Sequence, residues 1–285
     1  MKEGLVRGCA CRGTAGFAHV SCLAEQAKIL VAEAEENNLD IKVQNARLTR
    51  WHTCSLCEQD YHGVVVCALG WACWKTYLGR PEADQTRGVA IGLLGNGLSI
   101  AGHDEDALSV KEVELSTMRR LGASARRILS VQGNLAISYQ ALGRLEEALE
   151  IKREVYSGIL RLNGEENFDT LREANNYAAS LLIAKRFGEA KSLMRKSVPV
   201  ARRVLGESKT LAFRLKWSYA MALYKPTAAS LDDLREAVMT LEETERAARR
   251  ALGGSHPYVA DIERTLREAR DTLSAREAPS TRQAD

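Results

Sequence analysis

The six-residue stretch GRLEEA at residues 143–148 returns in altered form as KRFGEA at residues 185–190, 42 positions later. A three-residue stretch before each copy keeps the same offset, with NLA at 134–136 and NYA at 176–178. Between these stretches, apolar residues recur three and four positions apart, as they do along one face of an α-helix. A helical pattern with this period predicts stacked hairpins of two helices, because a single hairpin cannot bury its apolar face alone.

Further copies extend the repeat toward both ends of the chain. GHDEDA at 102–107 ends 41 residues before the first copy does, and LREA at 234–237 ends 47 residues after the second. The extra five residues fit a small insertion around residues 225–227. The alanine that closes every copy is small enough to let the second helix of a hairpin approach the first. We therefore predict a mainly all-α fold, an α-solenoid of about four helical hairpins over residues 87–274.

The composition is that of an ordinary globular protein. Charged residues make up 27% and hydrophobic residues 45% of the 285 residues, and 40 Lys and Arg against 37 Asp and Glu give a net charge of +3. This balance predicts no strong attraction to nucleic acid or to a membrane. The longest apolar run, 64–74, has 11 residues, whereas a transmembrane helix needs roughly 20. Because the N-terminus also lacks a secretory signal pattern, we expect a soluble, cytoplasmic protein.

All seven cysteines lie within the first 73 residues, and none follows. The polar segment 78–86, broken by a glycine and a proline, separates this part from the helical repeats and predicts a linker. We therefore divide the chain into a small cysteine-rich N-terminal module at 1–77, the linker at 78–86, the repeats at 87–274 and a disordered tail at 275–285.

Two helices are expected inside the N-terminal module. One covers residues 23–37. The other is a short apolar helix before the linker, in which Leu69, Trp71, Trp74 and Tyr77 are expected to share one buried face, because large aromatic side chains bury much area.

The cysteines of the module come in closely spaced pairs, together with one histidine. An odd number of cysteines in a reducing compartment disfavours disulfides, whereas pairs on tight turns present ligands to a tetrahedral zinc ion. Free buried thiols or a redox pair are the alternative, although a redox pair would need only one C-x-x-C motif. The candidate zinc ligands are Cys9, Cys11, His19, Cys22, Cys54 and Cys57.

The repeat resembles the tetratricopeptide repeat in the 42-residue form found in kinesin light chains. The last copy keeps that family's ending as LGGSHP at 252–257, and the resemblance covers about residues 88–273. It implies a groove, lined by the first helix of each hairpin, that binds a peptide or a protein surface. It also implies that Asn134 and Asn176 contact the ligand backbone. The alternative is that these asparagines brace turns of their own helices, and the third copy has Ser218 at this position.

The N-terminal module resembles the RING-CH zinc domain of certain ubiquitin ligases in three stretches, CRGT at 11–14, HVSCL at 19–23 and CSLC at 54–57. The resemblance implies two cross-braced zinc ions. The first and last cysteine pairs would hold one ion, and His19 and Cys22 would hold the other with a further pair. That pair would lie upstream of the first cysteine, where residues 1–8 contain none, so the sequence resembles an N-terminally truncated domain, through an incomplete gene model or a natural loss. The alternative is that a neighbour such as His62 or Cys67 substitutes for the missing pair.

The resemblance to RING-CH domains leaves two functions open. RING-type ligases have no nucleophile of their own and act by holding a ubiquitin-conjugating enzyme in a reactive orientation. The chain departs from the family at Gln26, where a tryptophan is usual, and at Glu58, where a basic residue is common. We therefore expect a non-catalytic zinc-binding adaptor that binds a peptide or protein. The alternative is a RING-CH-type ubiquitin ligase whose repeats select the substrate, and a third interpretation is an unexpressed relic of an expanded family.

Motifs of other enzyme classes are missing from the sequence. It contains no P-loop, no G-x-G-x-x-G, no G-x-S-x-G and no H-E-x-x-H motif. Nucleotide-binding, hydrolase and metalloprotease functions therefore have no support, and no catalytic residue is assigned.

Overall fold

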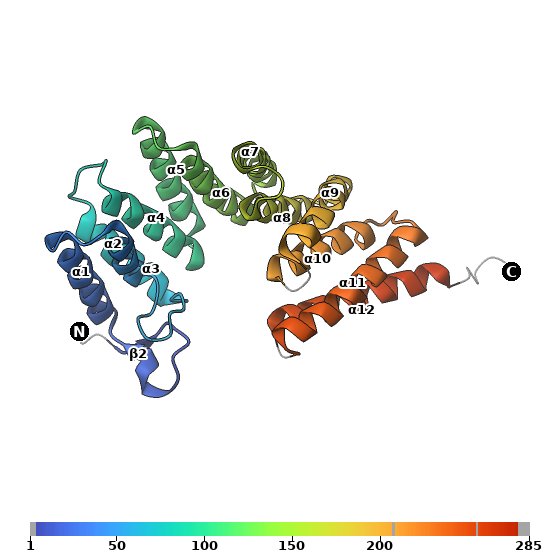
Figure 1. Cartoon of the computed structure of the whole chain (residues 1–285), viewed down its shortest axis with the longest axis horizontal. Helices are drawn as coiled ribbons and strands as arrows, with labels where there is room; N and C mark the ends of the chain where they lie inside the picture. Colours follow the sequence, from blue (N-terminus) through green and yellow to red (C-terminus); the bar gives the residue numbers. More distant parts are fainter. Residues whose placement is uncertain (1–3, 207–208, 255, 279–285) are drawn as a thin grey trace. The chain divides into compact units, whose positions relative to one another are not determined.

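The computed structural model of the protein describes residues 4–206, 209–254 and 256–278 (Figure 1). The chain divides into two compact units, one ending at Arg144 and the other beginning at Leu145. Both units are built almost wholly of helices that pack against their neighbours in sequence, so the predicted mainly α, solenoid-type fold is confirmed. Among the described residues, no helix combines the length and the hydropathy needed to cross a bilayer.

The first unit begins with a small two-stranded sheet and continues as six helices. The antiparallel strands pair Val6 with Ala18 and Arg7 with Phe17. Short 3-10 helices at Gly13–Gly16 and Thr49–Trp51 complete the N-terminal region. The elements are β1 (Val6–Arg7), β2 (Phe17–Ala18), α1 (Val20–Glu36), α2 (Ile41–Leu48), α3 (Val64–Tyr77), α4 (Gln85–Ile100), α5 (Asp104–Arg120) and α6 (Ala125–Ala141).

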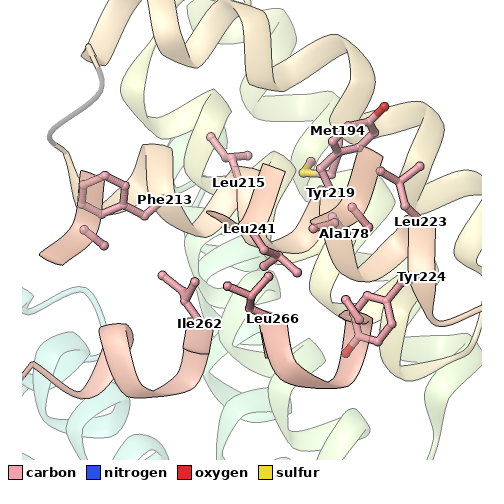
Figure 2. Close-up of a cluster of buried hydrophobic side chains, with 14 of the residues drawn as sticks. Ala178, Met194, Phe213, Leu215, Tyr219, Leu223, Tyr224, Leu241, Ile262 and Leu266 are labelled. Atoms are coloured by element: carbon pink, nitrogen blue, oxygen red, sulfur yellow. The ribbon is translucent and has the colours of Figure 1, made fainter. Parts of the chain in front are cut away.

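The second unit contains six further helices. Its core is a continuous cluster of buried side chains from α8 to α12, and Figure 2 shows Met194, Leu215 and Leu241 among them. The helices are α7 (Leu145–Asn163), α8 (Phe168–Ile183), α9 (Phe187–Leu205), α10 (Thr210–Tyr224), α11 (Leu231–Leu252) and α12 (Pro257–Glu277).

The closing alanines of the repeat copies and the predicted insertion lie where the sequence pattern places them. The closing alanines Ala107, Ala148, Ala190 and Ala237 are each no more than 1% exposed, so each can sit at a close helix crossing. The insertion predicted around residues 225–227 falls in the loop from α10 to α11, which is longer than the loop from α8 to α9.

One turn of the repeat uses the left-handed backbone region. The second residue after the first helix of a hairpin has φ of 78° at Gly102, 75° at Gly143 and 58° at Lys185. Glycine adopts this conformation without steric cost. Lys185 keeps the same turn without that freedom, so the repeat geometry overrides the preference of the residue.

The N-terminal helices form in the predicted places. The helix expected over 23–37 is α1, and Asp40 starts α2 by accepting hydrogen bonds from the backbone N–H groups of Lys42 and Val43, as helix N-caps do. The side chains of α1, α2 and α3 meet around Trp51, whose ring contacts that of Tyr77 edge to face with centroids 5.8 Å apart.

The predicted buried face of α3 was wrong at one position. Leu69 and Tyr77 are buried as expected, but Trp71 is 43% exposed. At about 100° of rotation per residue, Leu69, Cys73 and Tyr77 share one side of the helix, and Trp71 lies on the opposite side. The prediction grouped Trp71 with the other large apolar residues of the helix and did not take its angular position around the helix into account.

The predicted linker 78–86 lies between two helices that contact each other closely. A methyl group at Gly70 of α3 would lie 2.8 Å from the carbonyl oxygen of Leu93 in α4, and one at Gly97 of α4 would lie 3.0 Å from the Cα atom of Cys67. The two backbones therefore meet at these glycines. The predicted tail begins inside the end of α12, and its residues 279–285 lie outside the described part of the chain.

Candidate functional site

Four cysteines from two distant segments come together beside the small sheet. Cys9 and Cys11 lie between β1 and β2, and Cys54 and Cys57 lie in the loop before α3. Their four sulfur atoms all lie within 4.8 Å of one another, and the cluster can hold a metal ion. The structure thus brings together the first and last of the predicted ligand pairs.

The loop that carries Cys54 and Cys57 has the form of a tight knuckle. The backbone N–H of Glu58 donates to the carbonyl of Cys54 at 3.1 Å, and the N–H of Leu56 donates to the Cys54 sulfur at 3.4 Å. Glu58 closes the turn with a positive φ of 54°. The turn therefore directs both cysteine side chains to one point, as a zinc knuckle requires.

Backbone hydrogen bonds and close packing join the two cysteine segments. The backbone N–H of His62 donates to the carbonyl of Gly8 at 2.8 Å. A methyl group at Gly8 would lie 2.5 Å from the side chain of Val65, so only glycine fits between the segment and α3. The buried residues Val65 and Leu69 of α3 belong to the same buried cluster as Cys9, Cys11 and Cys54. The geometry of the cluster is therefore set by the fold around it.

Burial and hydrogen bonds shift the pKa values of the clustered thiols. The backbone N–H of Gln59, together with neighbouring thiols, lowers the pKa of Cys57 to about 7, whereas burial raises the pKa of Cys11 to about 12. Thiols this close cannot all ionise unless a positive charge lies among them.

The donor set fits zinc. The sulfur atoms of Cys11 and Cys54 are 3.7 Å apart. Zinc–sulfur bonds of about 2.3 Å in a tetrahedron place neighbouring sulfurs about 3.8 Å apart. Four thiolates in closed tetrahedral geometry are typical of a structural rather than a catalytic zinc site.

His19 and Cys22 lie outside this cluster. They stand at the start of α1, where the Cys22 sulfur is 3.8 Å from Nδ1 of His19, and Cys22 is exposed. Within the part of the chain that the structure describes, neither residue belongs to a group of three or more possible metal ligands. Their role as ligands stays a prediction.

The two asparagines predicted to contact a peptide are half-buried. Nδ2 of Asn176 donates to Oε2 of Glu173 in its own helix at 3.1 Å. The backbone carbonyl of Asn134 accepts a hydrogen bond from Nζ of Lys111 at 3.4 Å. The contact of Asn176 favours the alternative that it braces its own helix, and ligand contact by either residue stays a prediction.

A groove of about 480 Å³ lies along α8 and α10, the first helices of two successive hairpins. Its walls include Trp217 and Met221 of α10 and Ile183 of α8. The ring of Trp217 is held in place, because Nε1 donates to the hydroxyl of Thr265 at 3.0 Å. The groove is thus a largely apolar hollow with a fixed aromatic wall.

The polar side of this groove centres on Asn175, the neighbour of the predicted residue. Asn175 is 2% exposed. With its amide oriented so that both amide atoms have partners, its nitrogen donates to the hydroxyl of Ser218 and the carbonyl of Arg214 at 3.2 Å each, and its oxygen accepts from the Arg214 guanidinium at 3.1 Å. Alignment of the repeats pointed to Asn176. Helical phase was the signal that could have found Asn175, which lies four positions after the buried Leu171 and three before the buried Ala178.

The rim of the groove is basic. Lys185, Arg214 and Lys225 line it, and among its described lining residues none is acidic. Lys225 also pairs with Glu268 at 2.9 Å. A second hollow of about 520 Å³, between α7 and α9, is lined by both acidic and basic side chains, among them Glu165, Glu189 and Lys196, and so has no charge preference.

Comparison with known proteins decides the nature of the helical repeats. Residues 127–203 match the family model of the tetratricopeptide repeat. This stretch, from within α6 to within α9, is similar to tetratricopeptide repeats. No curated protein matches the chain in sequence.

Solved structures show that the repeat fold extends beyond that stretch. BtubC (BKLC) from P. vanneervenii is similar with a TM-score of 0.53 and 13% identity, over 94% of this chain and 97% of that chain. A Podosopora anserina protein of kinesin-light-chain type, with nearly identical TPR-like repeats, has a TM-score of 0.54 and 18% identity, over 82% of this chain and 99% of that chain. At these identities the similarity shows the fold, and the solved structures include one of the kinesin-light-chain type that the repeat pattern resembles.

Proposed function

We propose that the protein is an interaction adaptor whose tetratricopeptide repeats bind a peptide or protein segment in the groove between α8 and α10. The observation that carries this proposal is the groove itself, an apolar hollow with a fixed tryptophan wall and a basic rim. Apolar pockets with a few placed polar groups are typical ligand sites. No group in the groove suggests a reaction, so binding is the function that its chemistry supports.

The lining of the groove indicates the kind of segment that fits. Trp217 and Met221 offer contact area for an apolar side chain, and Trp and Arg are the residues that most often dominate binding energy. Arg214 is held by Asn175 and so presents its charge at a constant place. We therefore expect a segment with an apolar side chain next to one or more carboxylates.

The four-cysteine site has a structural part in this proposal. Cys9, Cys11, Cys54 and Cys57 would hold zinc, which supplies folding free energy when bound. The ion would join the segment after β1 to the loop before α3. The proposed domain division assigns this role to residues 1–77 and peptide binding to residues 87–274, with residues 78–86 between them.

The alternative function, a RING-CH-type ubiquitin ligase, rests on the sequence resemblance. It requires two metal sites that together shape the surface for a ubiquitin-conjugating enzyme. The described residues assemble one four-ligand cluster and leave His19 and Cys22 as a separate pair, which favours the adaptor. Ubiquitin release from a loaded conjugating enzyme, accelerated by this protein and not by a Cys54→Ser variant, would instead establish the ligase.

Selection from a displayed peptide library on the full chain tests the adaptor proposal. We expect acidic peptides with an apolar residue to be enriched. Their affinity should fall about tenfold in Arg214→Gln, which removes one charge-assisted contact, and by at least as much in Trp217→Ala.

The matched control is Lys209→Gln, which removes an exposed charge at the start of α10 outside the groove. It should leave the affinity unchanged. Enrichment of peptides that bind wild type, Arg214→Gln and Trp217→Ala equally well would show that the groove is not the binding site.

A further inference from the structure

The rim of the groove between α8 and α10 carries an excess of positive charge. Three basic residues line the groove, Lys185, Arg214 and Lys225, and its described lining contains no acidic residue. Nζ of Lys225 donates to Oε2 of Glu268 at 2.9 Å, so the charge of Lys225 is offset. Lys185 and Arg214 belong to no ion pair in the described chain. On this count, two positive charges are left for a ligand.

Arg214 is the cation whose position is fixed. Asn175 is 2% exposed, and its side-chain oxygen accepts from the Arg214 guanidinium at 3.1 Å. This contact uses one of the five N–H donors of a guanidinium. The planar fork of donors suits two oxygens of a single anionic group. A buried side chain thus holds a cation that can bind an anion through paired hydrogen bonds.

Lys185 brings the second cation from the turn between α8 and α9. The side chain is exposed, and its four-carbon stem is flexible, so the ammonium can follow an anion that Arg214 holds. The residue stands in the left-handed region with φ of 58°, where two earlier copies of the repeat have glycine. Backbone strain of this kind is concentrated at ligand sites and switches, and here it puts a cation on the rim.

The hollow between α7 and α9 has a different charge pattern. Glu165 and Glu189 line it together with Lys196. A strongly anionic ligand would meet two carboxylates there. The groove between α8 and α10 is therefore the better place for a ligand group with more than one negative charge.

We propose, building on the proposed peptide binding, that the segment held in this groove carries a phosphorylated residue beside its apolar side chain. A phosphoryl group has a charge of about −1.5 to −2 at pH 7 and three acceptor oxygens. It neutralises Lys185 and Arg214 together, whereas one carboxylate leaves one of the two cations uncompensated. The apolar side chain lies against Trp217. Phosphorylation of the partner then strengthens its binding to this chain.

Three versions of one peptide test the charge that the groove prefers. The acidic residue of a selected peptide is kept as Asp, replaced by Ser, or replaced by phosphoserine, and each version is titrated into the full chain at pH 7.5. We expect phosphoserine to bind about tenfold more tightly than Asp, because it adds charge-assisted hydrogen bonds. The Ser version should bind most weakly.

The same titrations at pH 5.5 separate a doubly charged group from any other acid. The second pKa of a phosphorylated side chain is about 6, so the phosphoserine peptide should lose about fourfold in affinity. The Asp peptide, with a pKa of about 3.9, should keep its affinity. The groove should keep its own charge, because its described lining has no histidine or carboxylate and Lys225 lowers the pKa of Glu268.

Variants of the rim locate the phosphoryl group. Arg214→Gln and Lys185→Gln should each remove most of the preference for phosphoserine over Asp. Lys185→Gly should do the same, and it restores the residue that Gly102 and Gly143 supply at this turn, so a disturbed turn cannot explain the loss. Lys209→Gln, outside the groove, should keep the full preference.

The results distinguish this inference from the proposed function. Equal affinities for the phosphoserine and Asp peptides, both lost in Trp217→Ala, would overturn the inference and leave peptide binding in place. A chain that binds none of the peptides would overturn both. Inorganic phosphate that competes as strongly as the phosphopeptide would show a site for free phosphate and overturn the inference as well.

Discussion

Glu114 on α5 is a carboxyl group buried inside the repeats, 7% exposed. It fits because α4 has a glycine opposite it, where a methyl group at Gly92 would lie 3.0 Å from Oε1 of Glu114. Burial raises the pKa of Glu114 to about 7, although the positive charges of Lys111 and Arg127 act in the other direction. The protonated form is therefore favoured by folding.

The raised pKa predicts a pH dependence of stability. Between about pH 4.5, the ordinary value for Glu, and about pH 7, the folded chain binds more protons than the unfolded chain. The contribution of Glu114 to the free energy of unfolding is therefore fully present below that window and falls as pH rises through it, by on the order of 3 kcal/mol at most. Urea unfolding at pH 5 and pH 7.5 measures this.

The variant Glu114→Gln keeps the shape of the side chain and removes the titration. It should lose less stability than wild type over this pH range. Glu105→Gln removes an exposed carboxyl from the same helix and should keep the wild-type slope. An identical slope in Glu114→Gln and wild type would show that Glu114 does not titrate in this range.

At the scale of single residues, the sequence predicted the geometry of local turns better than it predicted which side of each helix is buried. Cys54 and Cys57 were predictable as partners because a C-x-x-C spacing forms a knuckle by itself. The burial of Glu114 and Lys111 was not predictable in this way. It depends on which side of each helix the neighbouring helices cover, and that is settled by packing.

At the scale of elements, the contact between α3 and α4 joins the cysteine module to the first repeat helix. Gly70 lies against the backbone of Leu93, with 2.8 Å between a methyl group added there and the carbonyl oxygen. Backbone cannot move aside as a flexible side chain can. Gly70→Ala should therefore force the helices apart and destabilise the protein by about 1–3 kcal/mol or more.

Gly79→Ala is the matched control for this substitution. Gly79 follows α3 in the predicted linker, and a methyl group there would have no other atom within 4 Å. Denaturant unfolding should give nearly wild-type stability for Gly79→Ala and a clear loss for Gly70→Ala. Equal stabilities would mean that the two helices do not approach as closely as described.

The helices themselves were largely predictable, because the same short stretches of sequence recur in each copy of the repeat. The 42-residue period located the turns, and the alanines that close the repeat copies are buried. The close approach of α3 to α4 escaped prediction, since the glycine and proline between them indicated only a linker. Trp71 escaped for a related reason, because an apolar helix contains more large side chains than one buried face can hold.

At the scale of the whole molecule, the two candidate sites lie in different units. The four-cysteine site is in the unit that ends at Arg144, and the groove between α8 and α10 is in the unit that begins at Leu145. Metal should therefore affect stability mainly through the first unit. The cluster closes a loop of some 40 residues between Cys11 and Cys54, so a bound ion would restrict the unfolded chain as well as bind the folded one.

The central claim is that the four cysteines form one structural zinc site on a tetratricopeptide scaffold. Zinc content per purified chain tests it most directly, measured in Cys22→Ser so that the exposed pair cannot contribute. The account predicts one zinc per chain, lost when Cys54 is also replaced by Ser. A chain that retains no zinc, or one that keeps its zinc after Cys54→Ser, would contradict the account.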